Sequence, residues 1–157
     1  MRFRASSSFL FLVLAGSAFA QSPGQWHDSK DGISLKAKDY KHSISVKNQG
    51  GVLSFIVTSP QYLRTQPEKI KATVRFDTAR PQSFEMVNVK KSLAVVTDQQ
   101  ARSLIEQLAG AKKLHVRLYS HDERYCDDLV FDNTYLDLPA NTSDVIGKVL
   151  GSSTSAQ

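Results

Sequence analysis

Strict alternation of apolar and polar residues is the feature that most constrains the fold of this chain. It is clearest in residues 69–77, KIKATVRFD. The apolar side consists of Ile70, Ala72, Val74 and Phe76, and the polar side of Lys69, Lys71, Thr73 and Arg75. Since successive side chains of a strand point to opposite faces, this pattern predicts a β-strand with one buried face. Residues 114–120, LHVRLYS, alternate in the same way, with Leu114, Val116 and Leu118 on the apolar side and His115, Arg117 and Tyr119 on the outward side.

Glycines mark a further hairpin between two apolar-rich segments, residues 43–47 and 52–57. Residues 48–51, NQGG, are predicted to form the turn. Pairing Lys47 with Val52 would bring Val46 opposite Leu53 and Ile44 opposite Phe55, all on one face.

The strongest helix signal covers residues 98–109. Thr97 and Gln100 have the spacing of a capping box. In this motif the Thr97 hydroxyl accepts a hydrogen bond from the backbone N–H three residues later. The predicted apolar stripe is Ala101, Leu104, Ile105 and Leu108. Gly110 is predicted to end the helix in the left-handed conformation, followed by Lys112 and Lys113 beside the negative end of the dipole.

A second, shorter helix is predicted to begin near Thr142 or Ser143. Its predicted buried side is Val145, Ile146, Val149 and Leu150. The order of strands, helix, hairpin and short helix predicts an α+β domain: an antiparallel β-sheet of hairpins with both helices packed on one face. We expect a single domain over residues 33–150 and a disordered polar tail over 151–157.

The first 20 residues have the pattern of a Sec-type signal peptide. Arg2 and Arg4 precede the apolar segment FLFLVLAG, and Ala18-Phe19-Ala20 fits a cleavage site. Ser17 stands where a bacterial lipoprotein would carry cysteine, so no lipid anchor is expected. We therefore expect a periplasmic or secreted protein without a stable membrane anchor. Residues 21–32 are predicted to form a flexible leader, with Trp26 resting on the domain.

Net charge, cysteine count and sequence motifs limit the classes of function that we expect for this chain. Loss of Arg2 and Arg4 lowers the net charge from +5 to +3, which is too mild to favour nucleic acid. Cys126 is the single cysteine, so neither an internal disulfide nor a paired-cysteine zinc site can form. Motifs for a serine nucleophile, a zinc protease or a phosphate loop do not occur in the sequence. We therefore expect no enzyme, no cofactor and no metal.

Residues 120–128, SHDERYCDD, gather many reactive side chains. Pairing Ser120 with Tyr125 across the loop 121–124 would set Arg117 opposite Asp128, His115 opposite Val130 and Leu114 opposite Phe131. This register leaves an exposed loop tip as a candidate contact site and turns Asp127 alone toward the core. The tip residues are His121, Asp122, Glu123 and Arg124.

The polar side of residues 69–75 offers a second candidate binding surface through Lys69, Lys71 and Arg75. Three uses remain open from the sequence. It is an ordinary solvated face, or it binds an acidic patch on a partner protein, or it binds an anionic polymer of the envelope.

Three segments carry a resemblance to a known family: IKATVRFDTARPQSFEM, TDQQARSLIEQLAGAKKLHVRLYS and LVFDNTYLDL. In this order they resemble the exported domain of invasion-associated locus B proteins and similar type VI secretion accessory proteins. The chain departs from many of these in lacking paired cysteines. The resemblance implies a non-enzymatic periplasmic protein linked to the envelope, virulence or secretion, which binds another envelope or secreted protein. The alternative is a periplasmic inhibitor or immunity protein that blocks a cell-wall-degrading enzyme.

Overall fold

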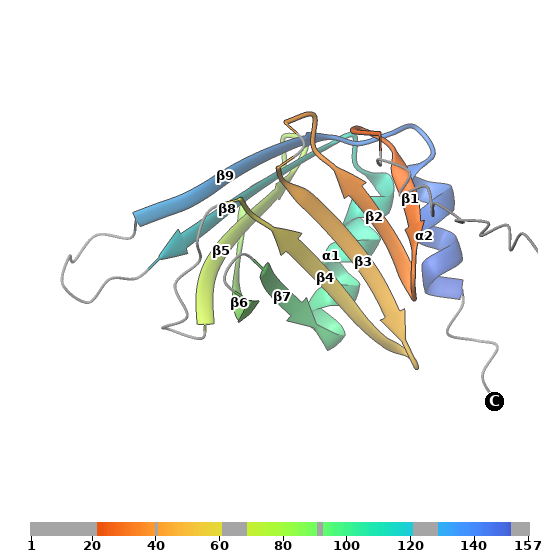
Figure 1. Cartoon of the computed structure of the whole chain (residues 1–157), viewed down its shortest axis with the longest axis horizontal. Helices are drawn as coiled ribbons and strands as arrows, with labels where there is room; N and C mark the ends of the chain where they lie inside the picture. Colours follow the sequence, from red (N-terminus) through yellow and green to blue (C-terminus); the bar gives the residue numbers. More distant parts are fainter. Residues whose placement is uncertain (1–21, 40, 61–68, 91–92, 121–128, 152–157) are drawn as a thin grey trace, which may run out of the picture.

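The protein is described by a computed structural model that covers residues 22–39, 41–60, 69–90, 93–120 and 129–151. It forms a nine-stranded sheet and two helices (Figure 1). The strands are β1 (Trp26–Ser29), β2 (Gly32–Lys36), β3 (Ser43–Gln49), β4 (Val52–Thr58), β5 (Lys69–Phe76), β6 (Gln82–Lys90), β7 (Leu93–Thr97), β8 (Lys113–Ser120) and β9 (Leu129–Asp137). The helices are α1 (Asp98–Gly110) and α2 (Thr142–Gly151).

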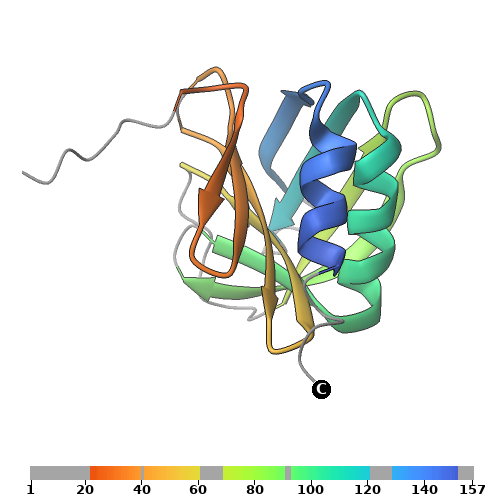
Figure 2. The ribbon, with the colours of Figure 1, turned by 90° about the vertical axis from the view of Figure 1, so that its right-hand side faces the viewer.

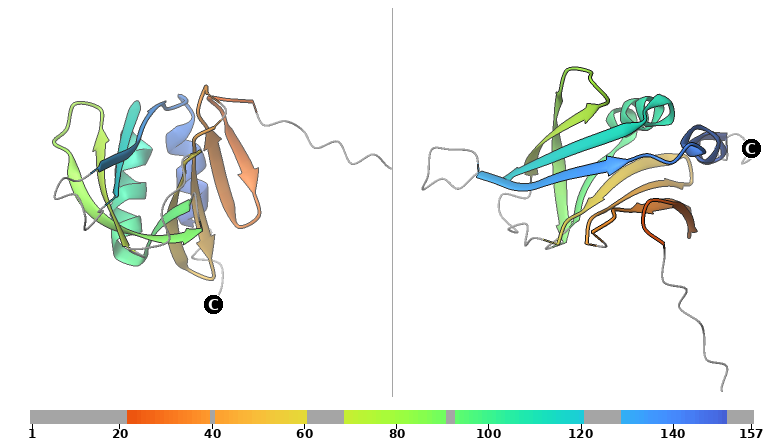
Figure 3. Two further views of the ribbon diagram at one scale, coloured as in Figure 1. Left: turned by 60° about the vertical axis from the view of Figure 1, so that its left-hand side comes forward. Right: turned by 90° about the horizontal axis from the view of Figure 1, so that it is seen from above.

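All neighbouring strands of the sheet are antiparallel, in the order β1-β2-β3-β4-β7-β6-β5-β8-β9. The sheet curves around α1 and α2, which lie side by side (Figures 2 and 3). One buried cluster joins residues of β2 to β8 with both helices and Leu136 of β9. The predicted α+β class, with helices on one face of an antiparallel sheet, is confirmed.

The β3–β4 hairpin forms as predicted but with a shorter turn. Gln49 pairs with Val52, so Val46 lies opposite Phe55 rather than Leu53. Gly50 and Gly51 have φ angles of 59° and 91°, the positive values that a type I′ hairpin turn requires at both central residues. The predicted register was therefore wrong by two residues, and an even shift keeps the same side chains on the buried face.

The β8–β9 hairpin departs further from the prediction. Strand β9 begins at Leu129, and its pairing sets Leu114 opposite Leu136, His115 opposite Tyr135 and Arg117 opposite Asn133. The predicted partners Phe131, Val130 and Asp128 were wrong. At the end remote from the connecting loop, the Leu138 N–H donates to the Lys112 carbonyl at 2.8 Å, which continues the observed register beyond β8.

Helix α1 has the predicted buried stripe, but both of its ends differ from the prediction. Thr97 makes no side-chain capping bond and donates instead to Asp98 Oδ2 at 3.2 Å. The positive φ of Asp98, 63°, turns the backbone at the helix start and brings these two side chains together. At the other end Gly110 is not left-handed. Extended backbone at Ala111 ends the helix, with its N–H bonded to the Leu108 carbonyl.

The amino-terminal segment is part of the sheet. Residues 26–29, expected in the leader, form β1 and pair with β2. The Trp26 indole N–H donates to the Thr142 hydroxyl at 2.8 Å, and that hydroxyl donates to the Pro139 carbonyl at 2.6 Å. Trp26 is half-buried against the core, so it packs on the domain as expected. This contact joins β1 to the start of α2.

Helix α2 buries the side that the sequence indicates. Ile146 and Val149 are buried, while Val145 and Leu150 are half-buried against the core. Neither of the two helices within the described ranges has the length and apolar character needed to span a membrane. Residues 1–21 and 152–157, which include the expected signal peptide and most of the expected tail, lie outside the described residues.

Candidate binding face

The side of β5 and β8 that faces away from the helices is rich in positive charge. These strands pair antiparallel, with Thr73 opposite Arg117 and Arg75 opposite His115. Their outward residues are Lys69, Lys71, Thr73 and Arg75 on β5, and Lys113, His115, Arg117 and Tyr119 on β8. Lys or Arg occupies five of these eight positions. We refer to the eight residues as the cationic face.

Tyr119 is the centre of a cation–aromatic cluster on this face. Arg117 Nη1 donates to Tyr119 Oη at 3.4 Å, and Lys71 Nζ lies 5.5 Å from the centroid of the Tyr119 ring. The Arg117 hydrogen bond lowers the pKa of Tyr119, and partial burial opposes this change. A hydrogen bond from Thr73 and the charges of Arg117 and Lys71 also lower this pKa. The cluster therefore stabilises the ionised, negatively charged form of Tyr119.

His115 and Tyr135 extend the face onto β9. Their rings stack with centroids 4.1 Å apart and an angle of 17° between the planes. Tyr135 is nevertheless 63% exposed, which leaves a large aromatic surface open to solvent. Cross-strand aromatic pairs of this kind stabilise a sheet, and exposed tyrosine is common at protein interfaces.

Acidic residues border the cationic face on both sides. Glu85 on β6 pairs with Lys69 at 3.4 Å, and Asp137 on β9 pairs with Lys38 at 3.1 Å. All four side chains are mostly exposed, so each pair contributes roughly 0–1 kcal/mol to stability.

Arg75 has a different environment from the exposed lysines. Its Nε is buried and has no hydrogen-bond partner among the described residues. A small hollow of about 210 Å³ adjoins it. The lining residues are Arg75, Asp77, Lys113, Leu114, His115, Tyr135, Leu136 and Asp137.

A wider groove lies beside the lysines of β5, with a volume of about 950 Å³. Lys69, Lys71 and Val87 line it, together with residues of β7 and the first turn of α1. Val87 and Val89 on β6 are 48% and 57% exposed. The cationic face is therefore continuous with exposed apolar surface.

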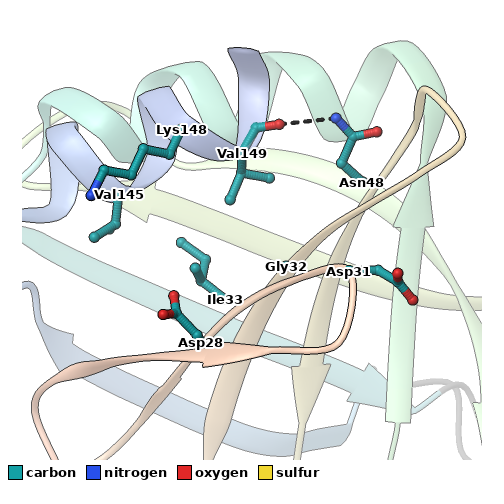
Figure 4. Close-up of a pocket in the computed structure, with 8 residues that line it drawn as sticks. All are labelled: Asp28, Asp31, Gly32, Ile33, Asn48, Val145, Lys148 and Val149. Atoms are coloured by element: carbon teal, nitrogen blue, oxygen red, sulfur yellow. Dashed lines mark hydrogen bonds between the residues drawn. The ribbon is translucent and has the colours of Figure 1, made fainter. Parts of the chain in front are cut away.

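A third concavity, of about 300 Å³, lies away from the cationic face, between the β1–β2 turn and α2 (Figure 4). Ile33, Val145 and Val149 form its apolar wall, and the carboxylates of Asp28 and Asp31 stand at its border. The Asn48 side chain donates to the Val149 carbonyl at 2.9 Å and closes one end. This concavity lies over the seam between α2 and the sheet.

The structure places the three predicted basic residues on one side of β5. Lys69 and Lys71 are exposed and Arg75 is half-buried. Arg117, His115 and Tyr119 were assigned to the outward side of their strand from the sequence. That β8 lies beside β5, and that Tyr135 rather than Val130 meets His115, could not be read from alternation alone.

The other predicted site lies outside the described residues. This holds for the loop tip His121–Arg124, and for Cys126, Asp127 and Asp128. Within the part of the chain that the structure describes, no group of three or more His, Cys, Asp or Glu side chains could hold a metal ion.

Comparison with known proteins gives a likeness in fold. No family model matches the chain, and no curated protein gives a significant match. Among solved structures, the crystal structure of invasion associated protein B from Bartonella henselae is similar, with a TM-score of 0.55 and 12% sequence identity. The match covers 86% of this chain and 98% of that chain. At this identity the likeness shows a shared fold, in agreement with the resemblance seen in the sequence.

Proposed function

We propose that this protein is an exported, non-enzymatic interaction module of the bacterial envelope, with a role in virulence or secretion. In this proposal the cationic face contacts another envelope or secreted protein. The observation that carries it is the set of Lys, Arg and Tyr side chains that β5 and β8 present together. Arginine and tyrosine are enriched at the centres of protein interfaces, where they contribute most of the binding energy.

A sheet face suits this role physically. Backbone pairing on both sides holds β5 and β8 in place, so their outward side chains start from fixed positions. The Tyr119 cluster and the His115–Tyr135 stack further restrict side-chain freedom. A surface ordered before binding loses less entropy when a partner docks. The fold shared with an invasion-associated protein is compatible with the proposal, although a fold alone does not specify function.

The proposal is tested by photocrosslinking from the face. A crosslinking amino acid replaces Tyr135, the protein is exported in a bacterial host, and the crosslinked protein is identified by mass spectrometry. We expect one main envelope or secretion component, and we expect its loss when Lys71→Glu and Arg117→Glu are added. Lys30→Glu with Lys41→Glu is the matched control, because both lysines are exposed away from the face and the change in charge is the same.

Two results would count against the module. An unchanged crosslink in the Lys71→Glu/Arg117→Glu protein would show that the face is not the contact. A lysozyme or amidase as the main crosslinked protein would favour the inhibitor instead.

Export is a separate part of the proposal. We expect the amino terminus of the periplasmic protein, read by sequencing, to begin near Gln21. Recovery of the full-length chain from the cytoplasm alone would rule this part out.

A further inference from the structure

We propose that the partner bound by the cationic face presents an extended acidic segment, and that one of its carboxylates binds Arg75. This inference rests on the proposed function and adds the chemistry of the partner. It is carried by charge, by the environment of Arg75 and by the spacing of the cations.

Charge complementarity is the first argument. None of the eight positions of the cationic face carries a carboxylate, and five carry Lys or Arg. The bordering acidic residues Glu85 and Asp137 lie opposite Lys71 and Lys113 in the strand pairing, and their side chains pair with Lys69 and with Lys38. They offset part of the charge and leave the five cations in excess. The potential over β5 and β8 is therefore positive and attracts an acidic chain.

The second argument is the unsatisfied donor of Arg75. A buried guanidinium N–H without an acceptor is unfavourable, because it has lost water and gained no partner. Arginine binds a carboxylate through two parallel hydrogen bonds, and one of its usual donors is Nε. Because Nε is closed to solvent, a carboxylate reaches it when the Arg75 side chain turns into the adjoining hollow. The carboxylate would then supply the acceptor that the described residues do not provide.

The hollow beside Arg75 gives such a carboxylate a place to bind. Lys113 adds a second positive charge to its lining, and the stacked rings of His115 and Tyr135 form a wall. Asp77 also lines the hollow, but its Oδ1 accepts the backbone amides of Lys112 and Lys113 at 3.0 and 2.8 Å. Asp137 forms the exposed ion pair with Lys38. The two carboxylates of the lining therefore already have donors, whereas Arg75 Nε lacks an acceptor.

Spacing provides the third argument. Outward residues of a strand repeat about every 6.6–6.8 Å, so Lys69, Lys71 and Arg75 follow one line with a single gap at Thr73. Acidic side chains on one side of an extended peptide repeat at the same interval. A peptide lying along β5 could therefore match several of these cations at once, with apolar side chains over Val87.

The experiment measures binding of fluorescently labelled poly-L-glutamate to the purified mature protein at low salt. We expect binding that weakens steeply as salt rises, because the contacts are ionic. Arg75→Gln and Lys71→Gln should each weaken binding by about ten-fold, the effect of roughly one lost charged contact. Lys30→Gln removes the same charge elsewhere and should change binding by less than about two-fold.

A second measurement needs no substitution. In the wild-type protein, the Arg75 Nε–H resonance should shift on titration with poly-L-glutamate, together with the Tyr135 ring resonances. Arg75→Lys, which keeps the charge and loses Nε, should bind more weakly than wild type. Equal binding by Arg75→Lys and wild type would overturn the role of the guanidinium.

The outcomes separate this inference from the proposed function. Absence of poly-L-glutamate binding overturns the acidic segment, and the Tyr135 crosslink then decides independently whether the face contacts a protein. Dextran sulfate represents a polymer without peptide character. Dextran sulfate could bind more tightly than poly-L-glutamate, and substitution of Arg75 and Lys71 could weaken its binding to the same extent. That result would make an anionic polymer, and not an acidic protein segment, the ligand.

Discussion

Asp77, which follows β5, holds the connection between α1 and β8. Its φ of 48° is a left-handed value that aspartate tolerates better than most residues. Its carboxylate accepts the amides of Lys112 and Lys113, and its own N–H donates to the Lys113 carbonyl at 3.0 Å. The aspartate that ends the segment VRFD is thus explained by structure, through the way it joins distant parts of the chain.

We predict that Asp77→Ala lowers the free energy of unfolding by about 1–3 kcal/mol, through loss of charged hydrogen bonds and backbone strain. Asp77→Asn should cost less, because it keeps an acceptor oxygen and tolerates the left-handed backbone. Urea unfolding of the three proteins checks this. Equal losses for the two variants would contradict the role of the side-chain oxygen.

Tyr119 gives a prediction about alkaline pH. Its pKa in the folded protein is lowered, with the Arg117 hydrogen bond as the largest cause. The folded state therefore favours tyrosinate. The resulting stability is fully present above the unfolded pKa, about 10. It is lost as the pH falls through the folded pKa.

We predict that Arg117→Gln raises the pKa of Tyr119 toward its ordinary value. The tyrosinate absorbance of each protein, minus that of the matching Tyr119→Phe protein, isolates this titration from the other tyrosines. An unchanged midpoint after Arg117→Gln would show that the hydrogen bond does not control the pKa.

At the scale of elements, strand identity could be predicted but strand register could not. Alternation assigned the buried and outward sides of β5 and β8 correctly because it depends only on neighbouring residues. Register depends also on contacts between residues that are far apart in the sequence. In β8–β9 the bond between Leu138 and Lys112 holds the end remote from the loop, and no local pattern records it.

The β8–β9 register is testable with engineered disulfides in a Cys126→Ser protein. His115→Cys with Tyr135→Cys should oxidise readily, because directly paired Cα atoms lie about 4.5–5.5 Å apart. His115→Cys with Val130→Cys should not, since five residues of strand separate Val130 from Tyr135, roughly 17 Å. Mass spectrometry after mild oxidation measures both. Preferential oxidation of the second pair would contradict the observed register and support the one predicted from the sequence.

At the scale of the whole molecule, a polar contact joins the first strand to the last helix. The Trp26 indole donates to Thr142, whose hydroxyl is buried and also donates to Pro139. This contact links residues that are far apart in the sequence, and it attaches β1 to α2 at the border of the core. The sequence favoured a leader here, because β1 is short and lies within a polar, turn-rich segment.

We predict that Trp26→Phe lowers the free energy of unfolding by about 1–3 kcal/mol, because Thr142 loses a partner and apolar contact is reduced. Thr142→Val should cost a similar amount. The double variant should lose less than the sum of the single variants if the two side chains interact. Strict additivity in thermal or urea unfolding would contradict the contact.

The sequence by itself determined the fold class, the buried face of the main strands and the apolar stripes of both helices, because these follow from local periodicity. Tertiary structure alone decided the strand order and the hairpin registers, since these depend on packing and bonds between distant residues. It also decided that β8 lies beside β5. That single adjacency converts a row of basic residues into a surface that combines Lys71, Arg75, Arg117 and Tyr119.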